Sequence, residues 1–159
     1  MPDRGPEPAA GPGVELEREP GPRGSRPSRI ADQVREFHLA FGLPVAQQPA
    51  ADLSPGEVTL RQDLIEEEVA ELRQAAETGD LVAVADALAD IVYVAYGTAW
   101  VYGIGLDDVL DEVHASNMTK LGADGRPLHR ADGKVLKGPG YRPPQIAGVL
   151  ARQSLRAEQ

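Results

Sequence analysis

The longest apolar stretch of this 159-residue chain runs from Leu81 to Leu106, and it limits the folds that the chain can adopt. It contains only two charged side chains, Asp86 and Asp90. The apolar run after Asp90 lasts 16 residues, short of the roughly 20 that a membrane-spanning helix needs. A helix that is apolar nearly all round must be covered by other elements. The sequence therefore predicts a central, buried helix over residues 81–102 and no membrane span.

Helical spacing and helix-end signals predict the elements that surround this helix. A first helix starts after Ser28 and ends before Gly42. A second starts at a capping box with proline, Ser54–Glu57, and ends at Gly79. A fourth spans Leu106–Leu121. Short connections between these helices favour an all-α antiparallel bundle of four main helices.

The chain outside the bundle differs in composition. Residues 1–28 hold 7 prolines and 5 glycines, so we expect a disordered tail there. Residues 29–121 form the predicted helical domain. Residues 122–159 are rich in glycine, and we expect a loop-rich flap, with a hairpin turned at "GADG" or "ADGK", and a short helix from about Gln145 to Leu155.

Charge and cysteine content narrow the class of protein. The net charge of −9 disfavours a general nucleic-acid binder. Residues 29–119 carry 4 basic and 17 acidic side chains, whereas residues 120–142 carry 6 basic and 2 acidic ones. The chain has no cysteine, which excludes disulfides and favours a cytoplasmic setting. An acidic body with a basic flap suits an anionic ligand bound between them.

Three glutamates of the second helix share the side of its leucines. At about 100° per residue, Glu67, Glu68 and Glu71 fall within the same arc as Leu60, Leu64 and Leu72. Glu66 falls on the opposite, polar side. Asp86 and Asp90, four residues apart on the apolar helix, are also expected near the bundle interior.

Several buried carboxylates repel one another and need protonation, a basic partner or a cation. Basic residues are scarce in the helical region, and carboxylates are typical ligands of Mg²⁺, with Mn²⁺ as an alternative. The predicted metal ligands are thus Glu67, Glu68, Glu71, Asp86 and Asp90. A second interpretation, that the glutamates form an ordinary solvated helix face, stays open.

Further residues suit an anionic ligand beside such a metal. The fourth helix places an amide and an ammonium group at the end of its apolar stripe, and a lysine there can contact phosphate. For Asn117 and Lys120 the alternative is an ordinary role in packing or at the helix end, and for Tyr93 it is core packing. The predicted substrate-binding residues are Tyr93, Asn117, Lys120, Arg130, Lys134 and Lys137.

The segments "EEVAEL" at Glu67–Leu72, "DALADIVYVAYGTA" and "EVHASNMTKLGADGRPLHRADGKVLKGPGY" resemble the all-α nucleoside-triphosphate pyrophosphohydrolases. That superfamily includes MazG-like enzymes and phosphoribosyl-ATP pyrophosphohydrolase. The family motif EExxE matches at Glu67, Glu68 and Glu71. In its second motif, ExxD, Asp90 fits the aspartate, but Ala87 occupies the glutamate position, where Asp86 is the nearest substitute.

The resemblance implies Mg²⁺-dependent cleavage of a nucleoside triphosphate to monophosphate and pyrophosphate, with Glu67 or Glu68 as general base. A homodimer or homotetramer is expected, without nucleic-acid or membrane partners. Two alternatives remain: phosphoribosyl-ATP as the substrate, or a non-catalytic helical dimer or adaptor that retains the fold.

Overall fold

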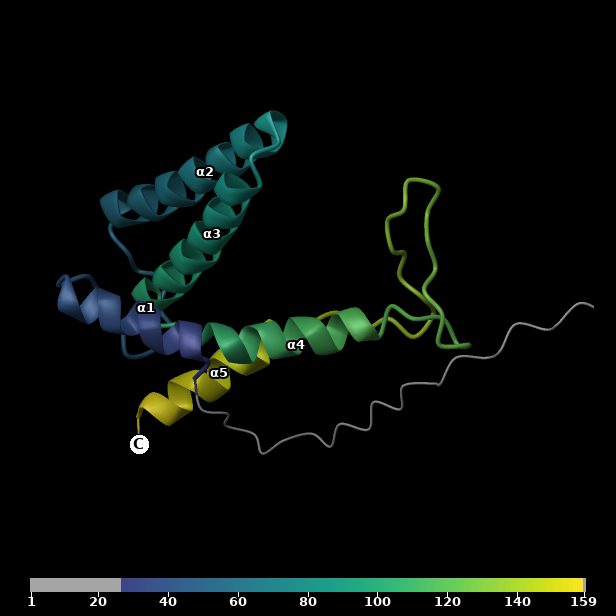
Figure 1. Cartoon of the computed structure of the whole chain (residues 1–159). Helices are drawn as coiled ribbons and strands as arrows, with labels where there is room; N and C mark the ends of the chain where they lie inside the picture. Colours follow the sequence, from purple (N-terminus) through teal and green to yellow (C-terminus); the bar gives the residue numbers. More distant parts are fainter. Residues whose placement is uncertain (1–26, 159) are drawn as a thin grey trace, which may run out of the picture.

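The computed structural model describes residues 27–158, and these residues form an all-helical protein, as predicted (Figure 1). The expected disordered tail lies outside the described residues, apart from its last two. Between residues 27 and 158 the extended structure is limited to an isolated bridge from His129 to Val135. The helices are α1 (Arg29–Ala40), α2 (Pro55–Thr78), α3 (Leu81–Val101), α4 (Leu106–Met118) and α5 (Ile146–Ala157).

Local capping interactions explain where the long helices begin and end. The Ser54 hydroxyl accepts from the Glu57 backbone N–H, and the Glu57 carboxylate accepts from the Ser54 N–H at 2.9 Å. Gly79 ends α2 in the left-handed conformation, with φ 70°. The Asp80 carboxylate then accepts from the N–H groups of Val82 and Ala83, which starts α3. The predicted limits of both helices are confirmed.

The helices pack in two groups. The chain turns sharply at Gly79–Asp80, so α2 and α3 pair as an antiparallel hairpin. α1 crosses the second half of α3, and this contact holds a small core around Ala31, Val34 and Tyr96. α4 leaves the end of α3, packs against α5 and points away from the hairpin (Figure 1).

α3 is much less covered than its composition predicts. Leu81 and Val82 are 78% and 80% exposed, and Leu88 and Val92 are also exposed. The prediction of a buried central helix is therefore not met within one chain, because α1 and α2 cover only part of α3 and α4 turns away. α3 is also long and apolar enough to cross a membrane by length and composition alone, a test that core helices of soluble proteins also pass.

Residues 120–142, hereafter the basic flap, extend beyond the end of α4 (Figure 1). The backbones of Arg130 and Lys134 pair across the turn at "ADGK", which confirms a short hairpin there. The base of the flap is attached to α4. Gly138 N–H donates to the Lys120 carbonyl, and the Ser116 hydroxyl donates to the Arg142 carbonyl at 2.8 Å.

Asp107 connects the first turn of α4 to two other helices. Its carboxylate accepts hydrogen bonds from the backbone and hydroxyl of Ser28, which caps α1, and from the hydroxyl of Tyr96 on α3. Burial favours the neutral acid, but these three hydrogen bonds outweigh burial and hold the pKa of Asp107 below its usual value. One carboxylate therefore joins α1, α3 and α4.

We expect the substitution Gly103→Ala to destabilise the protein by at least about 3 kcal/mol. Gly103 has φ 67°, and a Cβ there would lie 2.1 Å from the Gln48 carbonyl oxygen, so the loop that bonds Ala46 N–H to the Trp100 carbonyl must move. Gly42→Ala is the matched control, because Gly42 has the same φ but open space, and it should cost only about 1–2 kcal/mol. Urea unfolding measures both, and equal losses would contradict the steric argument.

Asp107→Asn should lower the free energy of unfolding at pH 7 by about 1–3 kcal/mol, because a charged acceptor of three hydrogen bonds is replaced. The lowered pKa of Asp107 means that its contribution is present above the unfolded-state value of 3.8 and is lost as the pH falls below it. The gap between wild type and variant should therefore narrow in acid. Urea titrations between pH 3 and pH 7 test this, and a gap that is independent of pH would contradict it.

Candidate functional site

The α2–α3 hairpin brings the predicted carboxylates into one region. Because the two helices run antiparallel from the turn at Gly79–Asp80, the middle of α2 lies opposite the first half of α3. Glu67, Glu68 and Glu71 therefore lie on the stretch of α2 that is opposite the part of α3 with Asp86 and Asp90. Carboxylates that are 15 to 23 positions apart in the sequence are brought into one region by this turn.

Glu68 is the centre of this group. Its Oε2 atom is buried and has no hydrogen-bond partner among residues 27–158. Burial raises the pKa of Glu68, and the negative charges of Asp90, Glu71, Glu67 and Asp86 raise it further. An unpartnered buried carboxylate oxygen is costly, so this atom is suited to a proton or a cation that residues 27–158 do not themselves supply.

The other four carboxylates surround Glu68 without closing on a single point. Glu67, Glu71, Asp86 and Asp90 are exposed, which corrects the expectation that they face inward. Within the described residues no three acidic or histidine side chains are close enough to form a ready metal site. Repulsion acts over longer distances than metal–ligand bonds, so like charges turn toward water while still raising the pKa of Glu68. Metal ligation by these residues stays a prediction.

The donor set nevertheless fits a hard divalent cation. Carboxylate oxygens are the ligands that Mg²⁺ takes in proteins, and Glu68 Oε2 is an orphan oxygen at the centre of four more carboxylates. Ala87, at the position of the missing family glutamate, is only 2% exposed and belongs to the helix packing. Asp86, next to it, is exposed and is the acidic group available on this turn of α3.

Two basic side chains of α1 and α2 are buried beside α3, and sequence reasoning did not single out either of them as a site residue. Arg61 on α2 is 9% exposed and His38 on α1 is 3% exposed. Both approach Gly97, where a Cβ would lie 2.8 Å from His38 Nε2 and 3.8 Å from Arg61 Nη1. Arg61 precedes Glu68 by seven residues, two helical turns, so a helical projection places both on the same side. That projection was the signal that could have identified Arg61.

Arg61 is a candidate contact for an anion. The ion pairs within residues 27–158 are Arg130–Asp132 and Arg156–Asp108, and neither involves Arg61. A buried guanidinium without a carboxylate partner is uncommon in proteins. His38 differs, because its Nδ1 lies 2.9 Å from the Pro44 carbonyl oxygen and its environment is that of a packed core residue.

Tyr93 lies one turn after Asp90 and packs edge-on against Phe37, with ring centroids 5.6 Å apart. This contact supports the packing role that was the alternative for Tyr93. A contact with the ligand stays a prediction.

The remaining predicted substrate-binding residues lie elsewhere in the chain. Asn117 and Lys120 are at the end of α4, and Arg130, Lys134 and Lys137 are on the basic flap. Figure 1 shows the flap on the opposite side of the molecule from the α2–α3 hairpin. One chain therefore does not bring these residues to the carboxylates, because α4 starts at the far end of α3 and extends away from it.

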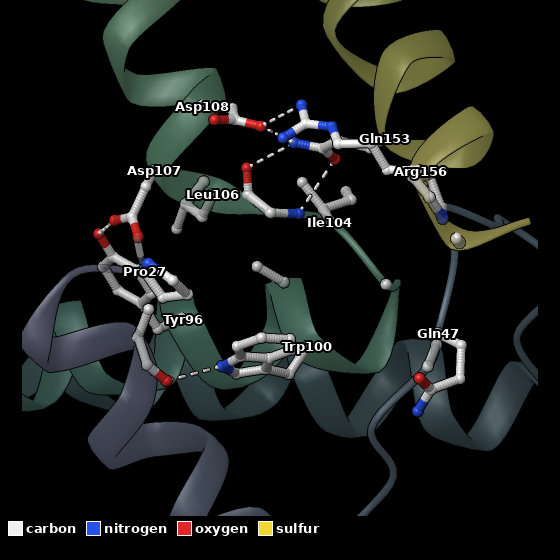
Figure 2. Close-up of a pocket in the computed structure, with 17 residues that line it drawn as sticks. Pro27, Gln47, Tyr96, Trp100, Ile104, Leu106, Asp107, Asp108, Gln153 and Arg156 are labelled. Atoms are coloured by element: carbon white, nitrogen blue, oxygen red, sulfur yellow. Dashed lines mark hydrogen bonds and ion pairs between the residues drawn. The ribbon is translucent and has the colours of Figure 1, made fainter. Parts of the chain in front are cut away.

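A cavity of about 340 Å³ lies at the C-terminal end of α3, between α1, α4 and α5 (Figure 2). Its polar side chains bond to one another: Gln153 contacts the Gly105 backbone and Asp108, and Arg156 donates to Asp108 at 2.8 Å. The five carboxylates are not among its lining residues. This cavity is therefore separate from the predicted site.

The chain is similar to proteins from two other sources. It is 47% identical to an uncharacterized protein of Acanthamoeba polyphaga mimivirus over 77 residues, which cover 46% of this chain and 31% of that protein. The chain thus spans about a third of the length of this curated relative. It also matches the structure of a provisionally named NTP pyrophosphohydrolase from Exiguobacterium sp. 255-15, with 26% identity and a TM-score of 0.44, covering 84% of this chain and 98% of that one.

The family comparison covers more than half of the chain and includes the site. The family model described as phosphoribosyl-ATP pyrophosphohydrolase matches residues 34–117, a range that contains all five carboxylates and Arg61. The chain therefore belongs to the phosphoribosyl-ATP pyrophosphohydrolase family, within the MazG-like all-α NTP pyrophosphohydrolase superfamily of hydrolases that act on nucleotides.

Proposed function

We propose that this protein hydrolyses a nucleoside triphosphate between its α- and β-phosphates, in a Mg²⁺-dependent reaction that releases monophosphate and pyrophosphate. One observation carries the proposal: the buried Oε2 of Glu68 has no partner within residues 27–158 and lies among four other carboxylates. Such a group is suited to a divalent cation and a polyphosphate. The family membership supports the same reaction class.

The acidic residues divide into two roles in this proposal. Glu67, Glu68, Glu71 and Asp90 hold the cation, and Asp86 takes the place of the absent glutamate. Mg²⁺, when bound, neutralises charge on the phosphate oxygens. Glu68 or Glu67 accepts the proton of the attacking water.

Arg61 supports the polyphosphate end of the substrate in this proposal. It is a buried cation on the same side of α2 as Glu68, and no carboxylate of the described chain pairs with it. A guanidinium can hold phosphate oxygens with two parallel hydrogen bonds.

Phosphoribosyl-ATP is the second candidate substrate, and the description of the matching family model favours it. Both candidates present a triphosphate, and the same bond would be cleaved in each. The difference lies in the base and its substituents, which the carboxylates do not contact. A panel of substrates is therefore required to distinguish the two.

We expect the purified protein with Mg²⁺ to convert at least one member of a panel to a monophosphate and pyrophosphate. The panel contains canonical and modified nucleoside triphosphates and phosphoribosyl-ATP, and ion-exchange chromatography separates the products. Glu68→Gln should reduce the rate by about 100-fold or more. Glu66→Gln, on the exposed polar face of α2, is the control and should retain the rate. Diphosphate with phosphate as products would show that the assignment of the bond is wrong.

Glu68→Gln should also make the metal-free protein more stable at pH 7. The unfolded chain loses the Glu68 proton near the ordinary value of 4.5, whereas the folded protein keeps it to a higher pH, so the stability of the wild type falls as the pH rises through this window. Glutamine carries no charge and avoids this loss.

Melting temperatures measured in EDTA between pH 4 and pH 8 test this, with Glu66→Gln again as the control. Added Mg²⁺ should raise the melting temperature of the wild type and have little effect on Glu68→Gln. If Mg²⁺ stabilised both proteins equally, Glu68 would not be a ligand.

A further inference from the structure

The cavity at the C-terminal end of α3 has the size and the lining of a small-molecule site (Figure 2). Its volume of about 340 Å³ lies at the lower end of the range for ligand pockets, roughly 300–1,000 Å³. We propose that it binds a small aromatic amine, that is, a flat ring that carries one ammonium group. The apolar and aromatic part of its lining consists of Ala31, Tyr96, Ala99, Trp100, Ile104 and Leu106.

The Trp100 indole is a fixed, flat wall of this cavity. Its N–H donates to the Ala31 carbonyl on α1 at 3.1 Å, and the Arg35 guanidinium, which is not among the lining residues, lies 5.8 Å from the ring centroid. The Tyr96 hydroxyl donates to Asp107 at 2.7 Å. Both aromatic side chains are thus held in place by a hydrogen bond. Rings that are already ordered lose little freedom when a flat ligand packs against them.

The charged side chains of the lining carry a net negative charge. They are Asp107, Asp108 and Arg156, two carboxylates and one guanidinium. Arg156 pairs with Asp108 at 2.8 Å, and Asp107 takes no part in the ion pairs of residues 27–158. Burial raises the pKa of Asp107, but the hydrogen bonds from Ser28 and Tyr96 hold it below its usual value, so this carboxylate is ionised at neutral pH. The cavity therefore attracts a cation and repels an anion.

The polar groups that face Trp100 across the cavity are already hydrogen-bonded (Figure 2). Gln153 accepts from the Gly105 N–H at 3.1 Å and donates to the Gly105 carbonyl at 2.9 Å. A ligand that used these groups for its own polar atoms would have to break existing bonds. Ring contact and charge therefore decide which ligand binds, and this combination suits an aromatic amine better than a sugar or a phosphate ester.

The same charge separates this cavity from the proposed reaction. A nucleoside triphosphate carries several negative charges, which the ionised Asp107 repels. The five carboxylates of the α2–α3 hairpin do not line the cavity. The inference is thus independent of the proposed function, and binding of the amine should require neither Mg²⁺ nor Glu68.

Three compounds that share a phenyl ring and differ in charge test the proposal: phenethylamine, phenethyl alcohol and hydrocinnamate. Trp100 is the only tryptophan of the chain, so its fluorescence, excited where phenyl rings do not absorb, reports binding at this wall. We expect the Kd of the amine to be at least about fivefold lower than that of the alcohol, with the anion weakest. No binding of the amine, or equal affinities for all three compounds, would overturn the proposal.

A second arm places the amine at the cavity and not at the acidic hairpin. Ala157 lines the cavity and is exposed, so Ala157→Phe narrows the cavity with little effect on the core. It should weaken binding of phenethylamine by about tenfold or more. Ala151→Phe is the matched control, because Ala151 is exposed on the same helix and lies outside the lining. Equal binding by the two variants, or loss of binding in Glu68→Gln, would place the amine elsewhere and contradict the proposal.

A third arm tests the role of charge. Arg156→Gln removes the one cation of the lining, and the Arg156 side chain is 51% exposed, so the fold should tolerate the change. The affinity for phenethylamine should rise about threefold, and that for hydrocinnamate should fall. Arg152→Gln, an exposed arginine of α5 outside the lining, is the control and should change neither affinity. A lower affinity for the amine together with a higher one for the anion would overturn the assignment of ligand charge.

Discussion

Repulsion among the carboxylates of the α2–α3 hairpin is the constraint on which the rest of the structure depends. The pairing of α2 with α3 holds five acidic side chains in one region and buries one oxygen of Glu68 without a partner. Apolar packing of the hairpin and of α1 must outweigh this repulsion for the chain to fold without a cation. The carboxylates of the hairpin therefore lower the stability of the fold and at the same time suit a ligand, a combination that is common at functional sites.

The surroundings of the carboxylates are buried toward one end of α3 and exposed to solvent toward the other. Toward the C-terminal half of α3, Gly97 admits the side chains of His38 and Arg61, and both are buried. Toward the N-terminal end of α3, α2 covers only one side of the helix, and Leu81 and Val82 are exposed. Electrostatic interactions are stronger at the buried end, beside the Arg61 guanidinium, than at the exposed end.

Local signals in the sequence predicted most of the helices and part of the site. Ser54, Gly79 and Asp80 act within a few residues of themselves, so the helix ends that they mark follow from the sequence alone. The inward position of Glu68 follows from helical spacing for the same reason. Spacing shows which side of a helix requires cover, but it does not show which chain provides the cover. For this reason the exposure of α3 and the separation of Lys120 from Glu68 were not predicted. The position of Arg61 on the same side of α2 as Glu68 follows from helical spacing and could have been predicted.

The direction of α4 has a mechanical consequence. α4 is attached at Asp108 to α5, and it carries Lys120 and the flap at its free end. Twelve residues separate Asp108 from Lys120, so a tilt of about 5° at the attachment displaces the lysine by about 1.5 Å. The contacts of Asp107 with Ser28 and Tyr96 and of Asp108 with Arg156 hold the start of α4, and Glu112 holds its middle against the Gln145 backbone. The position of the positive charge therefore depends on residues that lie outside the group of carboxylates.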